Sequence, residues 1–172
     1  MILVASVDAD IYQNFSKYVN SKNYVKACRY GKQIFASGER DEKIISVIGQ
    51  ICLKADFIDT TSALQSRLRK TKEARINAVV FSSVLLQKRL IYQFMYDGTD
   101  ISTLALPVSN HPLSDTFVAI RDNSFKQISD APKVIEFQKN SKKYKVYIDY
   151  NDKGRVIIEI LENNKITIHR YL

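Results

Sequence analysis

The chain has 172 residues, a length that suits one domain or a helical block with a small β appendage. Its 26 lysine and arginine residues outnumber 18 aspartate and glutamate residues, and the net charge of +8 favours encounters with anionic surfaces. No stretch approaches the roughly 20 apolar residues of a membrane-spanning helix, so the sequence predicts no integral membrane protein.

The first seven residues, 1–7, are apolar and end in small side chains, and Asp8 follows at once. They could be the end of a secretory signal peptide, or a short arm packed on the first helix. The sequence therefore favours a periplasmic or exported protein, and a cytoplasmic protein is the alternative.

Residues 8–98 are predicted to form an all-helical block, because apolar residues recur at helical spacing and capping residues fall at the breaks. About five helices are expected. Their predicted boundaries are a cap at Asp8 or Asp10, a stop at Gly38, a cap at Asp41, a cap at Asp59 or Thr60, a start at Thr71 and a stop near Gly98.

A triplet of a large, a small and a second apolar residue recurs in this block at positions 15, 48 and 81, each 33 residues after the last. A small residue on a helix face lets a neighbouring helix approach closely, and a period of this length is typical of stacked helical hairpins. The triplets are Phe15-Ser16 with Val19, Ile48-Gly49 with Cys52, and Phe81-Ser82 with Leu85.

The second predicted helix begins Asn23-Tyr24-Val25-Lys26-Ala27, with an aromatic residue three positions before an alanine. In this pattern and in the triplets, residues 10–98 resemble the tetratricopeptide-repeat (TPR) family. Thr60 and Gln93 stand where the family has alanine in the second and third units. The resemblance implies a TPR-like stack of helical hairpins that acts as a scaffold and binds other proteins.

The rest of the chain is predicted to be a connector, 99–132, with a short helix from Leu113 to Arg121, followed by a β-meander over 133–172. After Pro132 the apolar period changes to two, which indicates strands. Four strands at 133–139, 143–150, 155–162 and 165–172 are expected to form an antiparallel sheet packed on the helices. The predicted fold class is therefore α+β.

Catalytic and cofactor motifs are missing from the sequence. The glycines never form a phosphate-binding loop, and two cysteines and two histidines do not match zinc or haem spacing. The sequence thus predicts a non-enzymatic module without a cofactor or metal. The catalytic alternative is a hydrolase that uses the connector around His111, which lies near Ser109 and Asp115.

Two basic runs are candidate binding surfaces, although such runs are commonly solvated faces. The favoured function is protein–protein interaction with another protein, an acidic one in particular, and the edge strand of the sheet could pair with a partner's strand. The second run, at Lys139, Lys142, Lys143 and Lys145, interleaves with Tyr144 and Tyr147, so binding to nucleic acid or an anionic membrane surface is the alternative. The residues predicted to contact the protein partner are Arg67, Arg69, Lys70, Lys72 and Arg75.

Cys28 and Cys52 are expected to be neighbours. Antiparallel helices bring together residues equidistant from their connecting turn, and the turn near residue 39 or 40 reflects position 28 onto 50–52. In an exported protein the pair would form a disulfide, and in a reducing cytosol it would remain two buried thiols.

Overall fold

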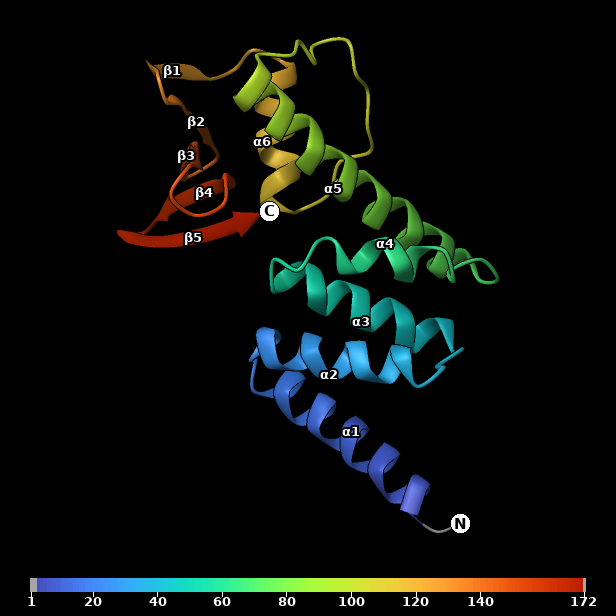
Figure 1. Cartoon of the computed structure of the whole chain (residues 1–172). Coiled ribbons are helices and arrows are strands. Elements are labelled where there is room, and N and C mark those ends of the chain that lie inside the picture. Colours follow the sequence, from blue (N-terminus) through green and yellow to red (C-terminus); the bar gives the residue numbers. More distant parts are fainter. Residues whose placement is uncertain (1–2, 172) are drawn as a thin grey trace. The chain divides into compact units, whose positions relative to one another are not determined.

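The computed structural model describes the backbone of residues 3–171 and the side chains of residues 9–171. Within this range, helices precede an antiparallel sheet, which confirms the predicted α+β class (Figure 1). The helices are α1 (Leu3–Asn20), α2 (Tyr24–Ala36), α3 (Glu42–Lys54), α4 (Thr60–Gln65), α5 (Lys72–Asp97) and α6 (Pro112–Arg121). The strands are β1 (Lys126–Asp130), β2 (Lys133–Lys139), β3 (Lys142–Asp149), β4 (Arg155–Glu162) and β5 (Lys165–Tyr171).

The chain divides into two compact units, Met1–Ser82 and Ser83–Leu172, that meet inside α5. The first unit holds α1 to α4 and the start of α5. The second holds the rest of α5, α6 and the sheet. No helix in the described part of the chain is long and apolar enough to cross a membrane.

Capping side chains fix the helix boundaries of the first unit. Asp41 accepts the backbone N–H of Lys43 at 2.8 Å, and Gly38 supplies the positive φ of +98° after α2. The predicted cap at Asp8 or Asp10 is wrong, because α1 already begins at Leu3. The apolar residues before Asp8 contain no helix breaker and continue the helix. Met1 and Ile2, the start of the predicted signal remnant or arm, lie outside the described residues.

The leading residues of the three repeated triplets, Phe15, Ile48 and Phe81, are all buried. Ser16 is exposed, and Val19 and Leu85 are half-buried, so only the second triplet is buried throughout. A Cβ atom built on Gly49 would lie 2.2 Å from the Phe81 ring, and one on Gly31 would lie 2.9 Å from Ile48. Glycine at these positions is what allows the large side chains of neighbouring helices to pack so closely.

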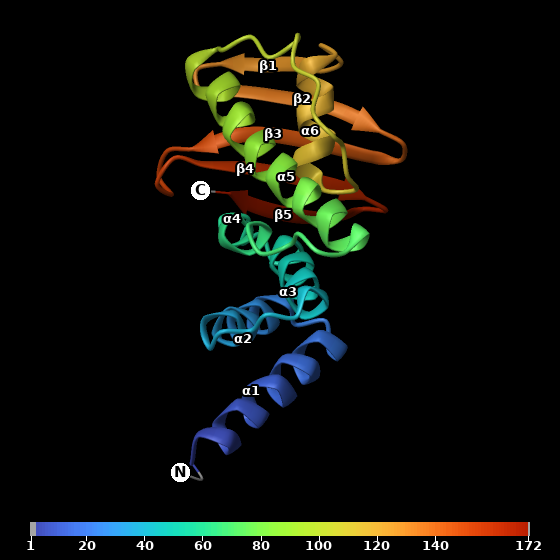
Figure 2. The ribbon, with the colours of Figure 1, turned by 90° about the vertical axis from the view of Figure 1, so that its right-hand side faces the viewer.

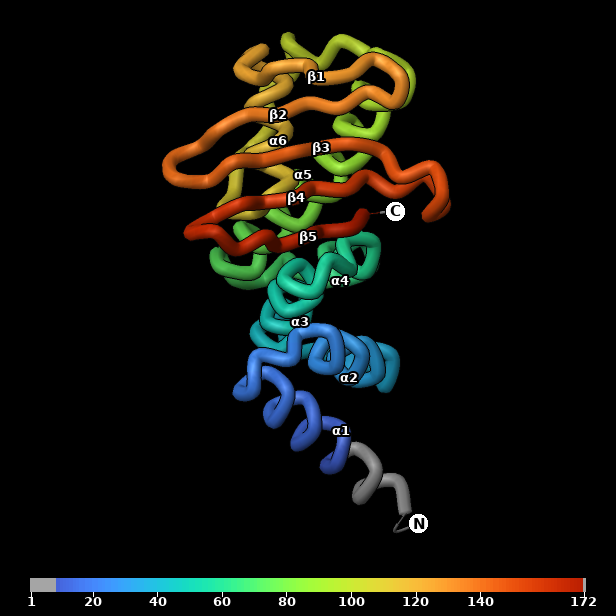
Figure 3. The backbone as a smooth tube through the Cα atoms, turned by 90° about the vertical axis from the view of Figure 1, so that its left-hand side faces the viewer, coloured from blue at the N-terminus to red at the C-terminus, as the bar shows by residue number. Residues whose placement is uncertain are grey.

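The sheet of the second unit is a meander in the order β1-β2-β3-β4-β5. The Ser83–Asp97 part of α5 and α6 cover one of its faces, while the other face carries no helix of this unit (Figures 2 and 3). The side chains of the covered face are buried at Val146, Ile148, Val156 and Ile158. Tyr150, the last residue of the predicted strand 143–150, instead follows the end of β3 and is 56% exposed.

Strand β1 was missed, so the sheet has five strands and not the predicted four. It pairs with β2, with a bulge between Gln127 and Ser129. Its only large apolar residue, Ile128, is 51% exposed. A polar edge strand without a buried face gives no alternating pattern in the sequence. Leu172, the last residue of the predicted final strand, lies outside the described residues.

Candidate partner-binding surface

The turn between α4 and α5, which carries the predicted basic residues, is fixed by a carboxylate from α3. Glu42 is buried and accepts the backbone N–H groups of Arg69 and Lys70, at 2.7 and 2.8 Å, and of Thr71 at 3.1 Å. These bonds satisfy donors at the start of α5. They also fix the path of the backbone from which the basic side chains project.

The electrostatics of Glu42 follow from the same contacts. The hydrogen bond from the Arg69 N–H, aided by those from Lys70 and Thr71, lowers the pKa of the Glu42 carboxyl below its ordinary value, and the Lys70 charge adds to this effect. Glu42 is therefore ionised at neutral pH, and its oxygens are occupied by backbone amides.

A second carboxylate fixes the turn between α2 and α3 in the same way. Glu39 accepts the backbone N–H groups of Arg40 and Asp41 at 2.6 and 2.7 Å, and it also accepts the Tyr12 hydroxyl. The Tyr12 hydrogen bond, followed by that from Asp41, lowers the pKa of Glu39. Arg40 therefore stands on a turn whose backbone is also bound by a carboxylate.

Two of the predicted contact residues use their guanidinium groups within the fold. Arg69 Nε donates to the carbonyl of Ser66 at 2.7 Å, and Arg75 Nη1 donates to the carbonyls of Arg69 and Lys70 at 3.0 and 2.9 Å. Arg75 thus closes the turn at the start of α5. Its guanidinium group is less available to a partner than predicted.

The turns enclose a hollow of about 430 Å³, which we call the basic hollow. Three of the predicted residues line it, whereas Lys72 and Arg75 do not. Arg40 also lines it and was missed by the sequence analysis, because a single arginine before a capping aspartate gives no signal. The charged side chains of the basic hollow are Arg40, Glu42, Arg67, Arg69 and Lys70.

The two cysteines form a disulfide between α2 and α3, with their Cα atoms 4.9 Å apart. Both residues are fully buried. The predicted proximity of Cys28 and Cys52 is confirmed. The two cysteines lie at equal distances from the turn near residue 39 or 40, and they meet because α2 and α3 are antiparallel neighbours joined by this short turn.

Each residue of the connector that could form a hydrolase site already forms a hydrogen bond with another group of the chain. The Ser109 hydroxyl lies 3.0 Å from that of Ser114, and His111 Nδ1 accepts the Leu113 N–H at 3.2 Å, which caps α6. Asp115 accepts the Tyr144 hydroxyl at 2.7 Å. The hydrolase alternative stays a prediction, and each group would have to leave its present partner to react.

The lysine-rich hairpin differs from the basic hollow, because several of its groups are paired. Lys139 forms an ion pair with Asp115, and Lys142 Nζ lies 3.3 Å from Glu162. Tyr144 is buried, and this burial raises its pKa, as does its bond to Asp115. Tyr144 therefore offers no exposed ring on which a nucleic-acid base could stack.

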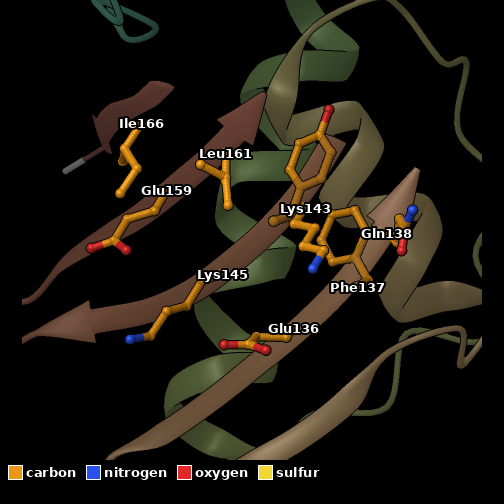
Figure 4. A pocket seen from close by; sticks show the side chains of 9 residues that line it. Glu136, Phe137, Gln138, Lys143, Lys145, Glu159, Leu161 and Ile166 are labelled. Atoms are coloured by element: carbon orange, nitrogen blue, oxygen red, sulfur yellow. The ribbon is translucent and has the colours of Figure 1, made fainter. Parts of the chain in front are cut away.

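On the uncovered face of the sheet, a hollow of about 450 Å³ has balanced charges. Lys145 stands between Glu136 and Glu159 of the neighbouring strands (Figure 4). Tyr147 on this face donates to Glu159 at 2.8 Å, and partial burial together with this bond raises the pKa of Tyr147 to about 12. This hollow has no marked preference for an anion or a cation.

The fold and the surface define an α+β chain with a disulfide-bonded helical unit and an antiparallel sheet. No family model, curated protein or solved structure matches the chain. The argument for function therefore depends on the geometry of the chain itself.

Proposed function

We propose that the chain is a non-catalytic protein-interaction module that binds an acidic partner through the basic hollow. One observation carries the proposal. Among the described residues, the side chains of Arg40, Arg67 and Lys70 form no hydrogen bond or ion pair, although the backbone beneath them is fixed by Glu39 and Glu42.

Fixed cations favour partner binding for two physical reasons. Unpaired positive charges attract an acidic surface and accelerate its association, and they select it over neutral or basic surfaces. A backbone that is already ordered loses less entropy when a complex forms. The resemblance to TPR scaffolds and the stacked helices of the first unit support the same function.

An exported or periplasmic location is part of this proposal, with the cytoplasm as the alternative. The Cys28–Cys52 disulfide supports it, because disulfides persist in oxidising compartments and are rare in the cytosol.

Affinity capture from cells of the source organism, with quantitative mass spectrometry, tests the proposal. The charge-reversal variant R67E/K70E should lose an acidic protein that the wild type retains. The matched control R29E/K32E changes the net charge equally at exposed positions of α2 and should keep that protein. Retention by both variants would contradict the proposal, and so would capture of nucleic acid or lipid alone.

A further inference from the structure

A second candidate site is an edge of the sheet in the second unit. The meander is open, so β1 and β5 are its two edge strands, and β4 is the only strand that pairs with β5 among the described residues (Figure 3). The outer side of an edge strand presents a row of backbone N–H and C=O groups that no neighbouring strand binds. Such a row is a template on which one more strand can pair.

The two edge strands differ in how well they are protected against further pairing. β1 has five residues, and its register shifts at the bulge between Gln127 and Ser129. A bulge twists an edge strand away from an incoming strand. β5 has seven residues, contains no proline or glycine, and pairs with β4 without a register shift from Lys165 to Tyr171. The regular template for an added strand is therefore β5.

The side chains of β5 differ between the two faces of the sheet. Ile166 and Ile168 lie on the uncovered face and are 58% and 41% exposed. Ile166 pairs with Leu161 of β4, which is 37% exposed on the same face (Figure 4). Lys165 and Thr167 lie on the opposite face, and both are exposed. The edge thus carries apolar residues at alternate positions and exposed polar residues between them.

Arg170 adds a positive charge at one end of this apolar row. It lies on the uncovered face, two residues after Ile168, and pairs with the buried Ile157 of β4. Its guanidinium group forms no hydrogen bond or ion pair within the part of the chain that the structure describes. An acidic residue of an added strand would therefore find an unpaired cation at this position.

We infer that β5 binds an extended segment of another protein, which adds a further antiparallel strand to the sheet. Antiparallel pairing continues the pattern of the whole meander. The bound segment carries an acidic residue opposite Arg170 and, two and four positions later, apolar residues opposite Ile168 and Ile166, because opposite residues share a face of the sheet. Backbone hydrogen bonds supply affinity, and the alternate side chains supply specificity.

A second copy of the chain fits this edge less well. β5 contains no acidic residue, so an antiparallel copy of the strand offers no partner for Arg170. The copy would also bring a second Lys165 and a second Arg170 to the same edge. The net charge of +8 on each chain opposes this association further. An acidic segment of another protein has none of these disadvantages.

This inference shares with the proposed function only the premise that the chain binds other proteins, and it uses a different surface. The test is fluorescence anisotropy of the full chain with a labelled peptide of about eight residues, in which valines follow a glutamate at the second and fourth positions and serines fill the rest. We expect saturable binding. Arg170→Glu should weaken it roughly tenfold. Ile168→Thr should weaken it several-fold, whereas the same change on the other edge, Ile128→Thr, should leave it unchanged.

A charge swap separates pairing at Arg170 from general attraction to a basic chain. A peptide with lysine in place of the glutamate should bind Arg170→Glu more tightly than it binds the wild type. Lys126→Glu, at an exposed position of β1, changes the net charge equally and should leave binding of the glutamate peptide unchanged. R67E/K70E should also leave it unchanged, so failure of the basic hollow and failure of the β5 edge can be distinguished. Thermal melting of each variant confirms that it is folded.

Hydrogen exchange measured by mass spectrometry locates the bound peptide. The peptide should slow exchange in β5 and leave β1 unchanged, because its backbone pairs with the edge of β5 alone. A peptide with prolines in place of the valines lacks backbone donors and should not bind.

Several results would overturn the inference. They are an absence of saturation below about 1 mM, equal binding of the proline peptide, wild-type affinity in Arg170→Glu, and slower exchange in β1 in place of β5. A dimer of the chain alone in sedimentation, lost in Ile168→Thr, would identify a second copy as the occupant and would equally overturn it.

Discussion

The two units use their charged side chains differently. In the first unit the carboxylates of Glu39 and Glu42 bind backbone amides, and the side chains of Arg40, Arg67 and Lys70 form no hydrogen bond or ion pair within the described residues. In the second unit several carboxylates instead pair with side-chain cations. Ion pairs there join Lys139 to Asp115, Lys142 to Glu162, Arg121 to Asp122 and Arg155 to Asp152.

The partners of the carboxylates determine where positive charge is available to another protein. A lysine paired with a carboxylate contributes little net charge to its surroundings, however basic the sequence around it. A carboxylate that binds backbone N–H groups orders a turn and leaves the neighbouring cations unpaired. The number of basic residues in a run is thus a poor guide to the charge that it presents. A run can attract an anion when the neighbouring carboxylates are bound to backbone amides and not to the basic side chains.

The units also differ in how they are held together. The first combines close apolar packing, a disulfide and the buried contacts of Glu42 with backbone amides. The second has a buried contact between two side chains, in which Gln87 of α5 accepts the Ser114 hydroxyl at 2.7 Å, and Gln87 also donates to the Pro107 carbonyl at 2.9 Å. These bonds tie the connector to α5 and α6.

The largest expected effect is loss of the disulfide. C28A/C52A should lower the free energy of unfolding of the first unit by about 3 kcal/mol, because the cross-link restricts the unfolded chain. Hydrogen exchange measured by mass spectrometry should show faster exchange in α2 and α3 and no change in β2 to β4. Equal acceleration in both units would show that they unfold together.

The next largest effect is the loss of stability expected when a glycine in the closely packed first unit is replaced. Gly49→Ala should cost about 1 to 3 kcal/mol, because the new Cβ would lie 2.2 Å from the Phe81 ring. Gly31→Ala should cost less, since its nearest contact is the Ile48 side chain at 2.9 Å. Urea denaturation of both variants measures the difference, and an equal or reversed order would contradict the packing described.

For the second unit, Tyr144→Phe removes a buried hydrogen bond to Asp115 and should cost about 1 to 2 kcal/mol. Tyr147→Phe is the matched control on the same strand. Its hydroxyl is only partly buried, so the loss should be under about 1 kcal/mol. Urea denaturation of the two variants would contradict this account if Tyr147→Phe proved the more costly change.

The smallest expected effect is a change in stability that occurs only at acidic pH. The pKa of Glu42 is lowered in the folded chain, so its stabilising contribution is present above its ordinary pKa of 4.5 and is lost as the pH falls through the lower folded value. Glu42→Gln should therefore flatten the acid side of a plot of melting temperature against pH. An unchanged slope would mean that the amide contacts of Glu42 are weak.

Local patterns in the sequence predicted much of the fold. The cap at Asp41 and the stop at Gly38 could be placed because each depends on one residue and its neighbours. Those boundaries in turn placed Cys28 opposite Cys52. Strand β1 could not be found in this way, because its pairing with β2 is a long-range property and its exposed Ile128 carries no pattern.

The candidate site was predicted only in part. A run of like charges placed Arg67 and Lys70 at the basic hollow, but Arg40 joins them from a turn distant in the sequence. Nothing local shows that Glu42 binds backbone amides or that Arg75 turns back to the carbonyl groups of its own turn.

The most direct test of the central claim is photo-crosslinking from the basic hollow in cells of the source organism. A photoreactive amino acid at Ser66, which lines the hollow, is compared with one at the exposed Gln33 of α2. The account predicts that Ser66 captures an acidic protein through an acidic segment and that Gln33 does not. Identical products at the two positions, or nucleic acid or lipid at Ser66, would contradict it.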